Sequence, residues 1–376
     1  MEPTFLTDDA YRRRLLAVVR LALVPGVGSR TYHLLVARFG SPDDVFQAAE
    51  GDLAAVSGVG PRLIRGIRNP PTTEEASALL EECSRLGIDV IWEEHPRYPR
   101  LLREIPDPPP LLFVRGTLMP EDELAIAIVG TRHASHYGMT MAERLAGGLA
   151  RAGLTVISGL ARGIDAAAHR GALAAGGRTV AVLGSGVDSV YPPEHANLAE
   201  DILQQGALVS EFPPRAAPHG GRFPQRNRVI SGMSLGTIVV EAGEKSGALI
   251  TARHAMEQNR EVFAVPGRAD QLQARGCNRL LRDGAALVET PEDVLQQLGP
   301  LVRPVKTGDA VVRKPIELTL NPVEQQILQA LDDDPTPIDR VIDSTALSAS
   351  QVLATLSVLE MRRLVRRVGG TMVQRL

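Results

Sequence analysis

Four glycine-containing segments between residues 129 and 252 carry side chains suited to binding phosphate. Arginine and lysine donate hydrogen bonds to phosphate oxygens, serine adds a hydroxyl group, and glycine lets a backbone N–H approach an anion closely. One or two such segments are enough for a mononucleotide, so four of them predict a longer polyanion. The candidate contacts are Gly130, Arg132, Ser158, Gly159, Arg162, Gly163, Phe223, Arg226, Asn227, Arg228, Lys245 and Ser246.

The third segment also contains an aromatic ring, Phe223, three residues before Arg226. This ring could stack on a nucleobase, because stacking on an aromatic face tolerates any base. Phe223 could equally pack beneath its own loop. The first interpretation extends the phosphate-binding prediction to single-stranded nucleic acid.

The motifs of the common nucleotide and hydrolytic sites are missing from these segments. The first turn lacks G-x-G-x-x-G, G-x-S-x-G is absent, and Gly243 lies too close to Lys245 for a Walker A loop. Asp165 and His169, four residues apart, could form a general base or a metal pair, but we interpret Asp165 as an acid at a helix start and His169 as its partner. We therefore predict no catalytic residue, no metal and no cofactor.

Charge is unevenly distributed along the 376 residues. The net charge is −3, which does not favour non-specific nucleic-acid binding, but residues 215–228 and 362–375 contain arginines and no acid. The two cysteines, Cys83 and Cys277, provide no disulfide framework. Without a signal peptide or an apolar run long enough to span a membrane, the chain is expected to be cytoplasmic.

Six short apolar runs, each followed by a helical stretch, must position these segments. Runs of this length without alternation are typical of strands buried on both faces of a parallel sheet. They predict a doubly wound, Rossmann-like α/β domain over residues 81–300, with a proline-rich extension at 81–123. The predicted strands span residues 125–131, 155–159, 179–184, 207–211, 237–242 and 261–267.

Residues 1–80 predict an all-α domain with two similar hairpins. Each has a Gly-Val-Gly turn before a new helix, at Gly26 and Gly28 and again at Gly58 and Gly60. Such helix–hairpin–helix turns leave backbone N–H groups free to hold a DNA phosphate. A role in packing or in docking another protein is equally consistent, so these glycines are only possible auxiliary DNA contacts.

Residues 301–318 have no periodicity and predict a linker. Residues 319–376 predict a winged-helix domain with three helices and a hairpin that turns at Gly369 and Gly370. Its third helix has few basic residues before Arg362, whereas a helix that reads duplex DNA presents polar and basic residues early. A duplex-DNA regulator is therefore less favoured than a protein-docking or auxiliary DNA module.

Taken together, the motifs resemble the DNA processing protein A family (DprA, also called Smf). The resemblance covers the α/β domain in order and includes Val129-Gly130-Thr131-Arg132, Ser158 to Asp165, Phe223 to Arg228 and Lys245-Ser246-Gly247. It implies a homodimer, formed through the Rossmann-like domain, that binds single-stranded DNA during natural transformation. It also implies that the protein shields the strand from nucleases and loads the recombinase RecA onto it.

The resemblance assigns the family's basic residue of the first loop to Arg132. A second family basic residue falls on Arg222 or His219, where the alignment leaves both open. The alternative function is a nucleotide N-glycosidic hydrolase of the lysine-decarboxylase-like type, in which Glu241 would lie near the active loop. That loop, P-G-G-x-G-T-x-x-E, is missing from the sequence.

Overall fold

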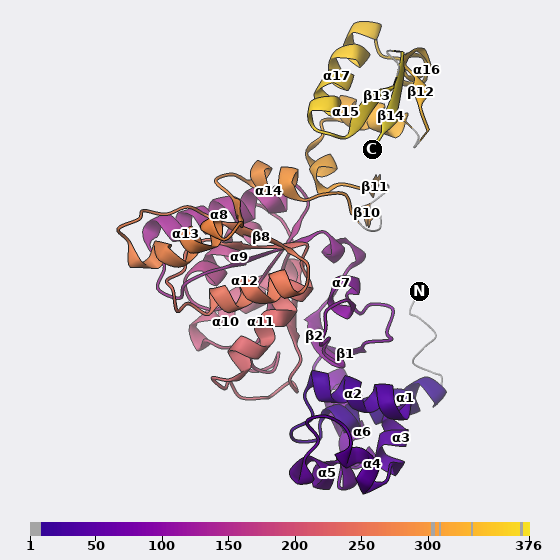
Figure 1. The fold of residues 1–376 in the computed structure, drawn as a ribbon, viewed down its shortest axis with the longest axis vertical. Coiled ribbons are helices and arrows are strands. Elements are labelled where there is room, and N and C mark those ends of the chain that lie inside the picture. The colour runs from indigo at the N-terminus through magenta and orange to yellow at the C-terminus, as the bar shows by residue number, and fades with distance from the viewer. Residues whose placement is uncertain (1–8, 302–304, 308–309, 332–333, 369–370) are drawn as a thin grey trace. The chain divides into compact units, whose positions relative to one another are not determined.

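The computed structural model describes residues 9–301, 305–307, 310–331, 334–368 and 371–376. Contacts divide the chain into two units, Met1–Ala285 and Ala286–Leu376. Figure 1 shows their elements, from the indigo helices near the N-terminus to the yellow helices and strands near the C-terminus.

The first part of unit 1 is helical, as the sequence predicts for residues 1–80. The fully buried side chains of Leu35, Leu53 and Ile67 belong to its apolar core. Its last helix starts with a capping box, in which Thr72 and Glu75 satisfy each other's backbone N–H groups. The helices are α1 (Asp9–Ala22), α2 (Ser29–Phe39), α3 (Pro42–Gln47), α4 (Glu50–Ala54), α5 (Pro61–Arg68) and α6 (Thr73–Arg85).

The rest of unit 1 is built on a sheet whose strands lie in the order β1-β2-β6-β5-β4-β3-β7-β8. Strands β3 to β8 pair in parallel, which confirms the predicted Rossmann-like α/β fold. Each predicted strand is present within a few residues of its expected bounds. The parallel strands are β3 (Ala125–Val129), β4 (Thr155–Ser158), β5 (Thr179–Val182), β6 (Ala207–Ser210), β7 (Gly236–Val239) and β8 (Glu261–Ala264).

Both faces of this sheet are covered, which explains the unbroken apolar runs. On β5, Val180 and Val182 belong to one apolar core, while Ala181 belongs to the core on the opposite face. Small residues on the helices allow close packing against the strands. The helices are α7 (Arg100–Arg103), α8 (His136–Arg151), α9 (Ile164–Ala174), α10 (Ala196–Gln205), α11 (Arg222–Gly232), α12 (Ala248–Glu257) and α13 (Arg275–Arg282), with 3₁₀ turns η2 (Pro120–Glu123), η3 (Pro193–His195) and η4 (Leu272–Ala274).

The proline-rich extension becomes the antiparallel edge of the same sheet. Strands β1 (Ile88–Trp92) and β2 (Leu111–Gly116) pair with each other, and β2 pairs with β6 so that Phe113 lies opposite Ser210. All but one of the prolines in the extension lie between β1 and β2, and Pro120 begins η2, so no ladder hydrogen bond is lost.

Unit 2 contains the winged helix. Its strands β12, β14 and β13 form one antiparallel sheet, and Ser348 with Gln351 forms the predicted capping box at the start of α17. Two short strands and a 3₁₀ turn lie within the segment predicted as a linker. The hairpin turn predicted at Gly369 and Gly370 lies outside the described residues. The elements are β9 (Ala286–Leu287), α14 (Pro291–Gln297), β10 (Val305–Thr307), β11 (Ala310–Val312), η5 (Pro315–Thr319), α15 (Pro322–Gln329), β12 (Thr336–Pro337), α16 (Ile338–Thr345), α17 (Ala349–Met361), β13 (Val365–Val368) and β14 (Met372–Arg375).

Within the described residues, no single helix is long and apolar enough to cross a membrane. In this part of the chain, α16 and α17 reach the required length and composition only when taken together, and they are bent by 115° at the break between them.

Candidate nucleic-acid interface

A cleft of about 720 Å³ opens at the carboxyl ends of strands β3 and β7. Ligands of open α/β sheets bind at this edge. Residues from all four predicted segments line the cleft. The second segment contributes Ala161 and Asp165 there, while its predicted contacts Gly159 and Arg162 line a smaller adjoining pocket. The predicted contacts that line the cleft are Gly130, Arg132, Phe223, Arg226, Asn227, Lys245 and Ser246.

Arg132 and Phe223 form one wall of the cleft. The Arg132 guanidinium lies 5.4 Å from the centre of the Phe223 ring, a cation–π arrangement. The ring is half-buried, and its centre is 5.5 Å from that of the exposed Tyr191 ring. A Cβ at Gly184 would lie 2.7 Å from Phe223 Cδ1, so glycine makes room for the ring. Phe223 therefore packs against its loop and still presents part of its surface to the cleft.

The opposite wall holds Lys245 and Ser246, just before α12. Lys245 is exposed, and the Ser246 hydroxyl accepts a hydrogen bond from Ala248 N at 3.3 Å. The first turn of α12 contains no acid. Asn227 on α11 donates to the carbonyl of Gly247 at 3.3 Å, which joins the starts of the two helices.

Arg226 forms part of the floor. Its side chain is buried, donates to the carbonyl of Gly159 at 2.6 Å and also donates to the carbonyl of Val182. Burial lowers the pKa of Arg226 to about 10, which leaves it charged at neutral pH. Arg226 therefore ties two strand ends together and adds positive charge beneath the cleft.

Two predicted glycine contacts serve packing between loops. A Cβ at Gly159 would lie 2.2 Å from Arg226 Nη2. Gly163 has a φ of +73°, and a Cβ there would lie 2.3 Å from the carbonyl oxygen of Thr131. Gly159 leaves space for the side chain of Arg226, and Gly163 leaves space for the backbone of the first loop. The sequence predicts a different role for both glycines, namely close approach of the backbone to a phosphate.

Three other predicted contacts already have protein partners. Ser158 is fully buried and donates to Ile128 O at 2.6 Å, because its hydroxyl points into the sheet. Arg162 is half-exposed and pairs with Glu194 at 2.5 Å. Arg222 donates to Ala217 O at 2.8 Å and does not line the cleft.

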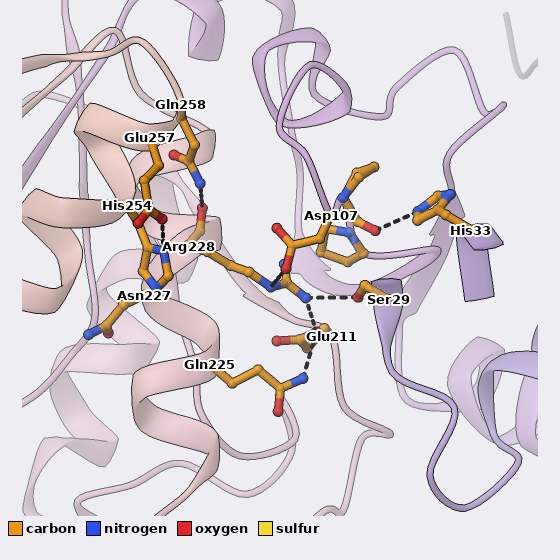
Figure 2. A network of polar contacts seen from close by, with 12 residues as sticks. Ser29, His33, Asp107, Glu211, Gln225, Asn227, Arg228, His254, Glu257 and Gln258 are labelled. Carbon is orange, nitrogen blue, oxygen red and sulfur yellow. Dashed lines mark hydrogen bonds and ion pairs between the residues drawn. The ribbon is translucent and has the colours of Figure 1, made fainter. Parts of the chain in front are cut away.

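Arg228 lies in a buried polar network that connects three parts of unit 1 (Figure 2). Its guanidinium pairs with Glu211 after β6 at 2.6 Å and with Asp107 of the extension at 3.2 Å. It also donates to the Ser29 hydroxyl at the start of α2 at 2.8 Å. Arg228 therefore holds the helical region, the extension and α11 together and does not reach the cleft.

The same network covers part of the first helix–hairpin–helix turn. Ser29, directly after Gly28, is buried against Arg228, so the start of α2 is partly covered. At the second turn, Gly58 and Gly60 are exposed, and Pro61 occupies the first position of α5. Gly26 and Gly28 are exposed as well, so the two turns differ mainly in the residue that begins the next helix, buried Ser29 in the first and Pro61 in the second.

Asp165 and His169 do not pair as the sequence predicts. Asp165 lies in the first turn of α9 and accepts from Ala161 N at 3.4 Å, and burial raises its pKa. His169 Nδ1 is 2.7 Å from the Thr179 hydroxyl, which donates to Val156 O. Burial lowers the pKa of His169 to about 3, so it is neutral. Across the described ranges, no group of three or more His, Cys, Asp or Glu side chains is arranged to hold a metal ion.

The sequence did not single out several residues that line the cleft. His133 follows Arg132 in the same loop, and its position there could have been used to find it. Leu272 and Gln273 reach the cleft from η4, which follows β8 after a loop. No motif marks these two residues, because their position depends on the path of that loop.

Two family models match the chain. Residues 89–299 match the model described as DNA recombination-mediator protein A, and residues 312–371 match the DprA winged helix domain. Protein Smf of Synechocystis is 35% identical over 94% of this chain and 96% of its own length. The DNA processing protein DprA of Streptococcus pneumoniae is 43% identical over 66% of this chain and 86% of its own length.

Two solved structures are similar in both fold and sequence. The X-ray structure of DNA processing protein A from Streptococcus pneumoniae matches with a TM-score of 0.65 and 33% identity, covering 75% of this chain and 96% of that one. DNA processing protein A from Helicobacter pylori, whose structure is described for its single-stranded DNA binding mode, matches with a TM-score of 0.50 and 29% identity. That match covers 55% of this chain and 93% of the Helicobacter chain.

Proposed function

The chain belongs to the DNA recombination-mediator protein A family, and on that premise we propose that its cleft binds single-stranded DNA. We further propose that it protects incoming strands from nucleases and loads RecA recombinase onto them during natural transformation. The observation that carries the proposal is the wall formed by Arg132 and Phe223, where a cation and a partly exposed ring face one cleft.

The cleft offers both groups that a single strand needs. Arg132 and Lys245 are exposed on opposite walls, where they can neutralise phosphates. Phe223, on the same wall as Arg132, offers a surface for an unpaired base, which duplex DNA keeps stacked within its helix. The described single-stranded DNA binding of the Helicobacter relative supports this proposal.

We propose that the protein acts without catalysis. The alternative hydrolase would need Glu241 near a substrate, but the Glu241 carboxylate accepts two hydrogen bonds from Ser135 and is buried. A cytoplasmic location is part of the proposal, because both cysteines are free and buried. RecA and a second copy of this chain are the proposed protein partners.

The function is tested with the full chain, purified RecA and a single strand covered by a single-strand-binding protein. We expect the chain to bind the strand, slow its digestion by an exonuclease and increase the rate at which RecA displaces the covering protein. Incubation with nucleoside monophosphates should release no free base. Release of base, or RecA loading no faster than without the chain, would contradict the proposal.

Removal of residues 319–376 should leave single-strand binding within about threefold of the intact chain. The cleft lies wholly within unit 1, and α17 contains no arginine or lysine with which to contact phosphates. Fluorescence anisotropy with a labelled oligothymidylate measures the two affinities. Complete loss of binding would mean that the winged helix is the main DNA-binding module.

A further inference from the structure

Glu241 places a carboxylate at the start of helix α8. It follows β7 and is 6% exposed. Its Oε2 accepts hydrogen bonds from Ser135 N at 2.9 Å and from the Ser135 hydroxyl at 3.0 Å. A Cβ at Gly138 would lie 2.1 Å from the same oxygen, so the carboxylate is packed directly against the first turn of the helix.

This position is where many α/β proteins hold the phosphates of a nucleotide. The helix after the first parallel strand directs free N–H groups and the positive end of its dipole at the ligand. In this chain that helix is α8, which follows β3 and has 16 residues. Its N-cap, Ser135, donates its backbone N–H and its hydroxyl to Glu241 and accepts from Gly138 N at 3.1 Å. The site for an external anion is therefore occupied by an internal one.

The helix starts that line the cleft have the opposite character from the start of α8. The first turns of α11 and α12 contain no acid, and Lys245 lies just before α12. External anions are thus favoured at Lys245 and Arg132, whereas at the start of α8 the Glu241 carboxylate repels them. A free nucleotide therefore lacks the helix start that usually binds its phosphates, whereas a polynucleotide can still contact Lys245 and Arg132 with separate phosphates.

We propose that Glu241 is a specificity-determining residue that excludes nucleoside diphosphates and inorganic pyrophosphate from the start of α8. The cleft thereby selects an extended strand over the free nucleotides that surround it in a cell. This inference rests on the proposed binding of single-stranded DNA in the same cleft.

The test compares the intact chain with Glu241→Ala, which opens a carboxylate-sized space at the start of α8. Binding of ADP and of inorganic pyrophosphate is measured by titration calorimetry, and by the shift in melting temperature that each anion causes. We expect Glu241→Ala to bind ADP at least about tenfold more tightly than the intact chain and to be stabilised by pyrophosphate. ADP should also compete with a labelled oligonucleotide in this variant only.

Glu244→Ala is the matched control, because it removes an exposed carboxylate three residues away. This control should behave like the intact chain with every ligand. If Glu241→Ala does not fold, Glu241→Gln removes the charge while keeping the side chain's size, and the same gain in ADP affinity is expected. Equal ADP affinity in the intact chain and the folded variant would overturn the inference. If the intact chain binds no oligonucleotide, the proposed function fails, while the ADP comparison still decides what Glu241 excludes.

Discussion

Replacing Arg132 with alanine is expected to weaken binding of a short oligothymidylate by at least about tenfold. Arg132 is exposed at the carboxyl end of β3, where its guanidinium covers one face of the Phe223 ring. Its loss removes a hydrogen bond to a charged phosphate, typically worth about 1.5–3 kcal/mol, and an exposed cation–π contact, typically worth about 0.5–1 kcal/mol. Arg226, the other arginine among the described residues that line the cleft, is held by backbone carbonyls and so is not placed to replace it.

The substitution should act on binding and leave the fold intact. The first loop is held by its backbone, with Thr131 N donating to Glu241 O at 2.7 Å and Ile164 N donating to Thr131 O at 3.3 Å. Neither bond involves the side chain of Arg132. The melting temperature of Arg132→Ala should therefore match that of the intact chain.

Anisotropy titrations over a series of salt concentrations provide the measurement. One lost phosphate contact lowers the slope of log affinity against log salt concentration by about 0.7 for a single strand. Arg170→Ala is the matched control, because Arg170 is an exposed arginine on α9 that does not line the cleft. Equal affinity of Arg132→Ala and the intact chain would show that the strand binds elsewhere.

The sequence predicts the sheet well because the physical signal is local. Apolar runs such as residues 125–131 must be buried on both faces wherever they occur, and the sheet buries them in this way. Loops that follow parallel strands necessarily gather at one edge, so Arg132 and Lys245 could be placed at a common site without knowing the strand order.

The sequence does not predict in the same way where each arginine side chain points, into the protein or towards the cleft. Arg226 and Arg228 belong to one motif and both are 4% exposed, although arginine is usually a surface residue. A buried arginine needs carbonyl or carboxylate partners, and those of Arg228 come from Glu211 and Asp107, which are distant in sequence. Only the packing of α11 against the sheet and the extension determines that these groups meet.

Because Arg228 is buried, replacing it is expected to have a large effect on the stability of unit 1. Arg228→Met should lower the free energy of unfolding of unit 1 by about 3–5 kcal/mol, because it leaves the buried Glu211 carboxylate without its counter-ion. Burial already raises the pKa of Glu211, and the charge of Arg228 opposes that rise. Without Arg228, the pKa of Glu211 should rise further.

Urea unfolding followed by circular dichroism measures the loss. The surface pair of Arg85 and Glu82, 4.0 Å apart, supplies the control, since Arg85→Met should change stability by less than about 1 kcal/mol. The double variant Arg228→Met with Glu211→Gln should be less destabilised than the sum of the single changes, because neither charge is then left alone.

The pH dependence of stability distinguishes an unpaired buried carboxylate at Glu211 from a simple loss of packing around residue 228. A carboxyl whose pKa is higher in the folded than in the unfolded state binds more protons when folded, so it destabilises the protein increasingly as pH rises between the two values. Arg228→Met raises the folded pKa of Glu211 further, so its stability deficit relative to the intact chain should shrink as pH falls from the variant's folded pKa towards that of the intact chain. A deficit that is equal at every pH would mean that Glu211 does not carry the effect. In that case, the network in Figure 2 would hold the helical region and the extension to α11 mainly by packing.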